Sequence, residues 1–255
     1  MSKQGPRPGR IKTAHRVFDV LELVRNRDGV SLSEVADEVG MAMSTAHGYV
    51  TTLEELGYLV REDEAFYLGL SFLQYGRVAR ERLGYVDIIE PTLEKVADQT
   101  GEAVWFIAEE CSRAIYLVNK EGSNAPRTTG AVGKEAPLHA TAAGKAILSA
   151  QSDELIDELT LEAYTGETIT DHDVLREEIA QVRETGVAYN DHEKLMGLRA
   201  VACPVRVNGR IIGAISVGGP AARIREEKFK EELPTYLRGV ANEIELNLSG
   251  EDIFG

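Results

Sequence analysis

The chain has 255 residues, of which 43% are hydrophobic, and is long enough to bury two separate cores. Its apolar runs are far shorter than the roughly 20 residues that a membrane span requires, and it shows no N-terminal signal segment, so we expect a cytoplasmic protein with no membrane partner. Two widely separated cysteines, Cys111 and Cys203, exclude a disulfide framework and a closely spaced metal-ligand pair, so neither a metal nor a cofactor is expected.

The formal net charge of −14 is unfavourable for a protein that neutralises phosphates, but the charge is unevenly distributed. Residues 1–16 carry five basic side chains and no acidic one, and residues 1–59 carry seven basic and eight acidic side chains. Nearly all of the acidic excess therefore belongs to the later part of the chain. This distribution predicts a nucleic-acid contact at the N-terminal end and argues against one in the second half.

A tail and two helices are predicted first. Residues 1–10 are rich in Gly, Pro and basic residues, which is typical of a disordered basic tail. Apolar residues then recur at helical spacing over residues 14–24, which predicts an amphipathic helix. Ser31 and Glu34 have the spacing of a capping box, which predicts a second helix that ends near residue 39.

A turn, a third helix and a hairpin complete the first domain. Gly40 supplies the left-handed residue of a tight turn before a helix that begins at residue 43 or 44 and ends at Leu56. Strand-like runs follow over residues 58–61 and 65–70, separated by three acidic residues, and read as a short antiparallel wing. This order of elements predicts a winged helix-turn-helix.

Beyond residue 70, helical and strand-like segments alternate. The predicted helices cover residues 70–82, 91–99, 141–150, 153–159, 173–184 and 226–248, and the predicted strands cover residues 103–108, 114–118, 200–207 and 210–217. Asn208-Gly209 predicts a tight hairpin between the last two strands, and hairpin strands with segregated helices predict an α+β domain with an antiparallel sheet. The predicted organisation is a disordered tail (1–10), a winged helix-turn-helix (11–70), a linker helix (71–82) and a second domain (83–255).

Several segments of the chain, in the same order, resemble the IclR family of transcriptional regulators. They are residues 13–16 (TAHR), 31–36 (SLSEVA), 44–47 (STAH), 52–58 (TLEELGY), 138–146 (LHATAAGKA), 191–193 (DHE), 197–199 (GLR), 202–205 (ACPV) and 214–220 (AISVGGP). The resemblance implies a winged helix-turn-helix followed by an effector-binding domain of GAF-like or profilin-like fold, in a homodimer or homotetramer. With 19 Arg, 9 Lys and 42 acidic residues, the composition is also similar to that of proteins from salt-adapted organisms, and a haloarchaeal source is our hypothesis.

DNA contacts are predicted from the residue types at the start of the third helix and in the basic arm. Small or polar side chains there let the backbone approach the groove and let hydroxyls reach phosphates and base edges. The predicted DNA-binding residues are Arg10, Lys12, Arg16, Ser31, Ser44, Thr45, His47, Gly48 and Thr51. The alternative is an ordinary capped surface helix. Gly48 stands where the family usually has an Arg, so one contact is expected to be absent.

A small-molecule site is predicted in the second domain. The start of the 141–150 helix offers backbone N–H groups to an anion, the 191–193 loop is implied by the resemblance, and Ser216 alternates inward on the last strand. The predicted effector-binding residues are Leu138, His139, Thr141, Ala142, Gly144, Asp191, Glu193, Ser216 and Gly218. The alternatives are tight helix packing for Gly144, a solvated acidic loop for residues 191–193 and core packing for Cys203. Asn190 and Gly218 depart from the acidic residue and the Ser that are common in the family.

These observations predict a ligand-responsive transcriptional regulator of a catabolic operon. Its expected partners are a pseudo-palindromic double-stranded DNA operator, a small effector such as a carboxylate, sugar acid or aromatic acid, and further copies of the chain. One alternative is an oligomeric DNA-binding protein without ligand sensing. The other is a small-molecule enzyme fused to a DNA-binding domain, but the chain has no nucleophile elbow, HExxH motif or CxxC spacing, so we assign no catalytic residue.

Overall fold

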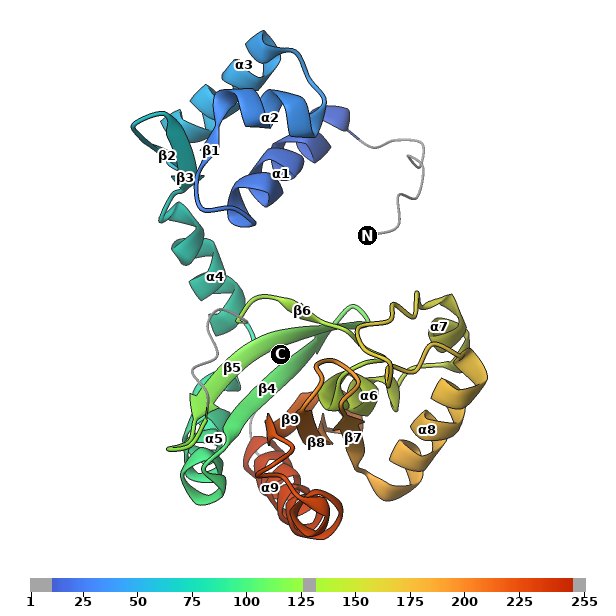
Figure 1. Cartoon of the computed structure of the whole chain (residues 1–255). Coiled ribbons are helices and arrows are strands. Elements are labelled where there is room, and N and C mark those ends of the chain that lie inside the picture. The colour runs from blue at the N-terminus through green and yellow to red at the C-terminus, as the bar shows by residue number, and fades with distance from the viewer. Residues whose placement is uncertain (1–10, 126–131, 250–255) are drawn as a thin grey trace. The chain divides into compact units, whose positions relative to one another are not determined.

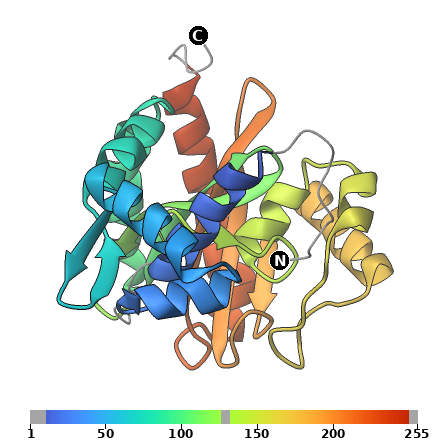
Figure 2. The ribbon, with the colours of Figure 1, turned by 90° about the horizontal axis from the view of Figure 1, so that it is seen from above.

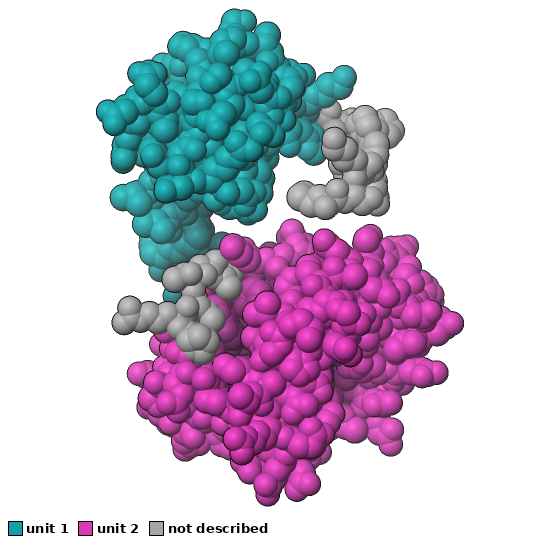
Figure 3. Space-filling model, viewed as in Figure 1, with its two compact units in different colours: residues 1–82 teal, residues 83–255 magenta. Residues whose placement is uncertain are grey.

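The computed structural model describes residues 11–125 and 132–249, and the chain forms two compact units, residues 1–82 and 83–255 (Figure 3). Unit 1 contains the helix-turn-helix, and unit 2 contains a large antiparallel sheet with helices on both faces (Figure 1). The predicted tail, residues 1–10, lies outside the described residues.

Unit 1 is a winged helix-turn-helix. Its elements are α1 (Lys12–Arg25), β1 (Val30–Ser31), α2 (Leu32–Val39), α3 (Met43–Glu55), β2 (Leu59–Glu62), β3 (Ala65–Leu68) and α4 (Ser71–Glu81). The core is formed where Val20 of α1, Val35 of α2 and Val50 of α3 pack together out of contact with water. The predicted capping box is confirmed, because the Ser31 hydroxyl accepts from the Glu34 N–H while the Glu34 carboxylate accepts from the Ser31 N–H.

Two details of unit 1 differ from the prediction. Strand β1 was not predicted; its two residues pair with Phe66 and Ala65 of β3, and so short a segment shows no alternation of apolar and polar residues. The second wing strand ends at Leu68, two residues before the predicted end, and the Gly69 N–H donates to the Tyr58 carbonyl oxygen at 2.8 Å. A Cβ atom at Gly69 would lie 2.2 Å from the Gly57 carbonyl oxygen.

Unit 2 combines a six-stranded sheet with helices on both faces. Its elements are α5 (Val86–Thr100), β4 (Ala103–Glu110), β5 (Arg113–Glu121), β6 (Glu135–Ala136), α6 (Ala142–Leu148), α7 (Asp153–Glu158), α8 (His172–Thr185), β7 (Ala188–Asp191), β8 (Leu198–Val207), β9 (Arg210–Pro220), a π-helical turn, η1 (Lys228–Glu232), and α9 (Leu233–Leu248). The strand order is β6-β5-β4-β9-β8-β7, and every neighbouring pair is antiparallel. The predicted α+β class and antiparallel sheet are therefore confirmed.

The sheet separates two hydrophobic clusters. Helices α5 and α9 cover one face, where Phe106, Val217 and Leu237 are buried. Helices α6 and α8 contribute to the cluster on the other face, where Ala146 lies among Ala202 and Ala214 of the sheet. Figure 2 shows α6 and α9 on opposite sides of the long strands β8 and β9. Residues that alternate along one strand therefore belong to different environments, and the α6 face is lined by unusually small side chains.

Three further differences from the prediction concern unit 2. The short edge strands β6 and β7 were not predicted. Helix α5 begins at Val86 rather than near Pro91, and Pro91 lies inside it on the exposed side. The last predicted helix is interrupted by the turn η1, and Pro234, which has no backbone N–H, lies directly after this turn.

Candidate DNA-binding surface and candidate effector site

The predicted recognition residues of α3 lie on two adjacent strips of the helix. Ser44 and His47 are exposed and share one strip with Thr51, whose hydroxyl oxygen lies 3.5 Å from Nδ1 of His47. Thr45 and Gly48 lie on the second strip, which faces α1. A Cβ atom at Gly48 would meet no atom within 4 Å, so packing in this chain does not require glycine there.

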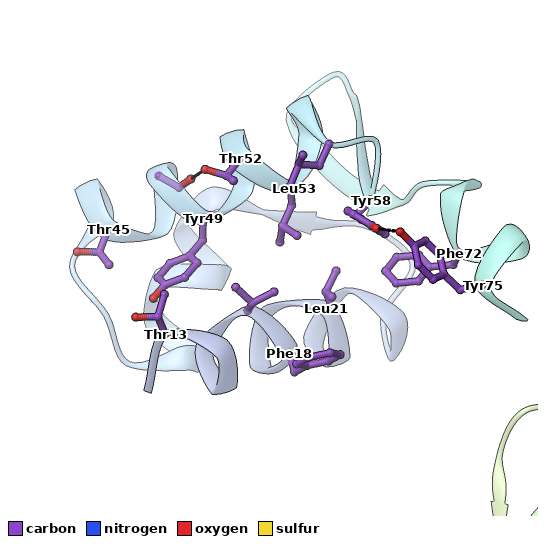
Figure 4. Close-up of a pocket in the computed structure, with 13 residues that line it drawn as sticks. Thr13, Phe18, Leu21, Thr45, Tyr49, Thr52, Leu53, Tyr58, Phe72 and Tyr75 are labelled. Atoms are coloured by element: carbon purple, nitrogen blue, oxygen red, sulfur yellow. Dashed lines mark hydrogen bonds between the residues drawn. The ribbon is translucent and has the colours of Figure 1, made fainter. Parts of the chain in front are cut away.

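An apolar groove of about 770 Å³ separates this second strip from α1 (Figure 4). Its walls come from α1, α3, the segment after α3 and the start of α4: Thr13, Val17, Phe18, Leu21, Thr45, Gly48, Tyr49, Thr52, Leu53, Leu56, Tyr58, Phe72 and Tyr75. Thr13 and Thr45 lie at one end, so the first turns of α1 and α3 are neighbours. At the other end the Tyr58 ring packs against Phe72 and Tyr75. This groove was not predicted, because its residues are spread over four segments of the chain.

Lys12 and Arg16 are the basic side chains available at this end of the unit. Within the described residues 11–70, every other Lys or Arg forms an ion pair with a carboxylate, as Arg61 does with Glu64. Lys12 and Arg16 are exposed and have no such partner, and α3 itself contains no Lys or Arg. The cations that could contact phosphates therefore lie at the N-terminal end of α1, beside the first turn of α3. Arg10 lies outside the described residues.

Ser31 and the wing offer less to DNA. The Ser31 hydroxyl also contacts Ser33 and the Glu34 carboxylate, so it is already engaged at the start of α2. The wing tip consists of Glu62, Asp63 and Glu64, and Asp63 adopts a positive φ of 52°. Three carboxylates at the tip would be repelled by phosphates, so the geometry favours α3 and the arm as the main DNA contacts.

In unit 2, Ser216 lies in a cross-strand row on the α6 face of the sheet. Ser216 of β9 is paired with Trp105 of β4 on one side and Ala202 of β8 on the other, and Trp105 is paired with Asn119 of β5. The Ser216 side chain has no hydrogen-bond partner among the described residues, and the residue as a whole is 7% exposed. In the same row the Asn119 Nδ2 is completely buried and unpaired. Buried polar atoms of this kind are rare in folded proteins, and a ligand can satisfy them.

The start of α6 closes this face. Thr141 caps the helix by accepting from the Gly144 N–H at 3.0 Å and donates to the Pro137 carbonyl oxygen. Leu138 and Ala142 are buried in the same cluster as the small residues of the sheet, while Gly218 lies opposite Ala200. These predicted residues are therefore brought together on one face.

Gly144 is required by packing. A Cβ atom at this position would lie 2.5 Å from the carbonyl oxygens of both Pro137 and Leu138. The conflict is with backbone atoms, which cannot move aside cheaply. This contact supports the alternative of tight helix packing that the sequence left open.

The carboxylates of the 191–193 loop are engaged within the unit. Asp191 pairs with Arg199 at 2.7 Å, and Glu193 Oε1 lies 2.7 Å from Nζ of Lys145. The Asn190 side chain donates to the Ala140 carbonyl oxygen at 2.7 Å and leaves its own Oδ1 buried and unpaired. The loop and the start of α6 are therefore neighbours, as predicted, but their contact is made by Asn190 and Lys145, which the sequence analysis did not assign to the site.

His139 is a buried, neutral member of this region. Its Nε2 donates to the Glu162 carbonyl oxygen at 2.9 Å, and burial lowers the pKa of its imidazole below the ordinary value. Its ring lies beside Tyr164, over which Nζ of Lys194 is positioned at 3.2 Å from the ring centroid. Among the described residues, no group of three or more His, Cys, Asp or Glu side chains could hold a metal ion.

A winged helix-turn-helix with exposed hydroxyls on α3, joined in one chain to an α+β domain that has unpaired polar groups on one sheet face, defines a DNA-binding regulatory protein. The model of the IclR helix-turn-helix domain matches residues 13–63, and that of the bacterial transcriptional regulator IclR C-terminal domain matches residues 79–246. The chain belongs to the IclR family of transcriptional regulators. The predicted family, fold class and DNA-binding function are thus confirmed.

Known relatives agree with this assignment over nearly the whole chain. The probable HTH-type transcriptional regulator ArcR of Halobacterium salinarum is 30% identical over 252 residues, which cover 94% of this chain and 95% of the relative. The transcriptional repressor IclR of Escherichia coli is 31% identical over 243 residues, covering 89% and 86%. No helix in the described part of the chain is long and apolar enough to cross a membrane.

Solved structures show the same fold. The Thermotoga maritima IclR structure has a TM-score of 0.75 at 30% identity and covers 94% of this chain and 100% of its own. An IclR homologue from Microbacterium hydrocarbonoxydans, complexed with 4-hydroxybenzoate, has a TM-score of 0.80 at 23% identity, covering 93% and 99%. At that identity the second likeness concerns the fold alone.

Proposed function

We propose that unit 2 binds a small organic acid and that the bound acid changes the affinity of unit 1 for its operator, which controls a catabolic operon. The observation that carries this proposal is the Ser216 hydroxyl, which has no hydrogen-bond partner among the described residues, beside the buried and unpaired Asn119 Nδ2 on the α6 face of the sheet. A regulator needs no catalytic group, and we propose no enzymatic activity, cofactor or metal for this chain.

The chemistry around Ser216 favours an acid with an apolar or aromatic body. Trp105 and Tyr116 meet edge to face on this side of the sheet and offer ring surface, while Ala200, Ala202 and Gly218 are small residues. The backbone N–H groups of residues 142 and 143 precede the first donor of the α6 ladder, the Lys145 N–H, so they have no acceptor within the helix and could donate to a carboxylate. The complex of a related fold with 4-hydroxybenzoate is consistent with this class of ligand.

The proposal is tested by a thermal-shift screen of the full chain with small carboxylates, sugar acids and aromatic acids, 4-hydroxybenzoate included. An acid that raises the melting temperature should also change operator affinity in a titration. Ser216→Ala removes one hydrogen bond, worth about 1 kcal/mol, so the midpoint of the ligand response should shift several-fold while operator affinity without ligand is kept. Ser249→Ala, on the exposed end of α9, is the matched control.

If no compound shifts the melting temperature or operator affinity, the chain is a DNA-binding protein without ligand sensing. If Ser216→Ala leaves the ligand response unchanged, the acid binds elsewhere in unit 2. Loss of operator binding by Ser216→Ala without ligand would assign the residue to folding instead.

We also propose that the chain acts as a homo-oligomer paired through α4. None of the described residues of this helix is buried. Two of them are large apolar side chains that face solvent: Leu73 is 68% exposed and Val78 is 54% exposed. A helix of 11 residues is marginal in water without tertiary packing, so a partner surface is needed to stabilise it. The apolar groove of unit 1 continues into α4 through Phe72 and Tyr75, and a second copy would cover both.

Sedimentation velocity at micromolar concentration tests this pairing. Leu73→Glu should shift the full chain toward the monomer, whereas Gln74→Glu, the next residue on the same exposed helix, should not. A wild-type chain that sediments as a monomer while binding a pseudo-palindromic operator tightly would refute the pairing.

A further inference from the structure

Lys145 is a fully buried lysine on α6. Its side chain is 0% exposed, which is unusual for an ammonium group because desolvation is costly. Its Nζ forms ion pairs with Glu178 of α8 and with Glu193 of the loop after β7, the latter at 2.7 Å. One side chain thus connects three segments that are distant in sequence.

The cluster contains more negative than positive charge. Lys145 supplies one positive charge, while Glu178 and Glu193 supply two carboxylates, and Glu193 Oε2 is enclosed without any hydrogen-bond partner. Glu178 is 28% exposed and can remain hydrated, but the Glu193 side chain is only 8% exposed. Lys145 is therefore the main group that compensates the buried Glu193 carboxylate.

Glu193 in turn holds the loop between β7 and β8. Its Oε1 accepts from the backbone N–H of Asp191 at 3.4 Å, and its carbonyl oxygen accepts from the Thr168 hydroxyl at 2.6 Å. The Thr165 hydroxyl donates to the carbonyl oxygens of His192 and Glu193. The loop is therefore tied by its side chain to α6 and by its backbone to the segment before α8, and both ties meet at Glu193.

We propose that Lys145 is a positioning residue, which through Glu193 fixes the 191–197 loop against the first turns of α6 and so sets the closed shape of the effector site. The inference rests on the proposed function, because that proposal is what assigns effector binding to this site. The two carboxylates then have different roles: Glu193 transmits the position of Lys145 to the loop, whereas the partly exposed Glu178 is a second partner of Lys145 that does not hold the loop.

Amide hydrogen exchange on the full chain tests this inference without any effector. The loop contains amides whose hydrogen bonds depend on its folded shape, such as the His192 N–H to the Leu198 carbonyl oxygen and the Gly197 N–H to Nδ1 of His192. We expect Glu193→Gln to accelerate exchange in peptides over residues 190–198 by about tenfold or more. Exchange over β9 should stay at the wild-type rate.

The matched control is Glu178→Gln, which removes the other carboxylate but leaves the Lys145–Glu193 pair in place. We expect its loop exchange to remain within about twofold of wild type. If both variants accelerate loop exchange equally, or if neither does, Lys145 serves packing and charge balance alone and the inference is overturned.

A double variant distinguishes loss of the loop contact from unfolding of unit 2. Lys145→Met alone leaves two carboxylates unpaired, whereas Lys145→Met/Glu193→Gln removes the buried pair together and should keep the fold. This double variant should retain a wild-type exchange rate over β9 and still show the fast loop. A slow loop in the folded double variant would contradict the inference. A failed ligand screen would leave all of these rates unaffected, so the two proposals fail independently.

Discussion

Position 144 has no space for even one methyl group. The carbonyl oxygens of Pro137 and Leu138 would lie 2.5 Å from a Cβ atom there, and both belong to the backbone that precedes α6. Alanine is a better helix former than glycine, so helix propensity alone would predict a gain in stability at this position. The steric conflict is the larger effect.

We therefore expect Gly144→Ala to lower the free energy of unfolding by about 1–3 kcal/mol, as overpacking does elsewhere. Urea denaturation of unit 2 is the measurement. Gly166→Ala is the control, because a Cβ atom at Gly166 meets nothing within 4 Å. Equal stability of the two variants would show that the segment before α6 can move aside.

Glu193 makes a second residue-scale prediction, through pH. Burial raises the pKa of its carboxyl above the ordinary 4.5, the charge of Glu178 acts in the same direction, and Lys145 opposes both. The native state thus holds the proton more tightly than the unfolded chain. The contribution of Glu193 to stability is therefore greatest below pH 4.5 and is lost as the pH rises through the raised pKa.

The measurement is the free energy of unfolding of wild type and of Glu193→Gln over a pH series. Because glutamine does not titrate, we expect the wild-type value to fall relative to that of the variant as the pH rises above 4.5. Two parallel curves would mean that Glu193 has the same pKa in both states.

At the residue scale, the predicted effector-site residues of α6 and the last strand lie on one face of unit 2, but the contacts that build this face were not predicted. Ser216 and the small residues of the last strand followed from alternation, and the capping box at Ser31 followed from spacing. Lys145, Asn119 and Asn190 were missed, because their surroundings depend on strand register and on which helix covers which face. Strand register and helix placement are set by tertiary packing, which local sequence patterns do not specify.

Among the elements, we expect helix α3 and the start of α1 to make different kinds of DNA contact. Lys12 and Arg16 carry charge without base information, while His47 and its neighbours on α3 can reach base edges. We expect Lys12→Ala/Arg16→Ala to weaken binding to operator and unrelated DNA alike and to reduce the slope of log affinity against log salt by about 2. His47→Ala should instead change the preference among operator variants.

Fluorescence anisotropy at several salt concentrations separates these effects. Lys95→Ala, an exposed lysine on α5 in unit 2, is the control for loss of a positive charge. An arm variant with full affinity at low salt would show that the two cations take no part in binding.

Long, periodic elements were predictable and short ones were not. All three helices of the helix-turn-helix and the β8–β9 hairpin were expected from periodicity and turn residues, because each buries a regular stripe of its own. Strands β1, β6 and β7 have two, two and four residues and pair at sheet edges, so their sequences carry almost no alternation. Helix α5 begins at Val86, before the predicted start at residue 91, because the stripe of residues that it buries outweighs the one hydrogen bond that Pro91 cannot donate.

For the whole molecule, operator binding and oligomerisation should be inseparable. Two linked heads convert the second half-site contact into an intramolecular event, which raises affinity by roughly 10²–10⁴-fold without a new contact. We expect a fragment of residues 1–82 to bind a pseudo-palindromic operator at least about 100-fold more weakly than the full chain. The measurement is a mobility-shift titration of both proteins on the same operator.

A circular dichroism spectrum of the fragment, with helix content matching α1 to α4, is the control that it folds. Equal affinity of the folded fragment and the full chain would mean that a single head carries the binding energy. The same comparison on a half-site operator should show little difference, because only one head can then engage.

Within the described residues 11–70 the basic groups available to DNA are few: α3 has neither Lys nor Arg, and just Lys12 and Arg16 lack a carboxylate partner. Binding of the protein to DNA of any sequence depends on such cations, because this binding arises from the release of counterions from the phosphates. Binding to the chromosome's roughly 10⁶ or more competing sites is therefore expected to depend on the basic arm, residues 1–16, whereas α3, which has no Lys or Arg, is left to read the operator.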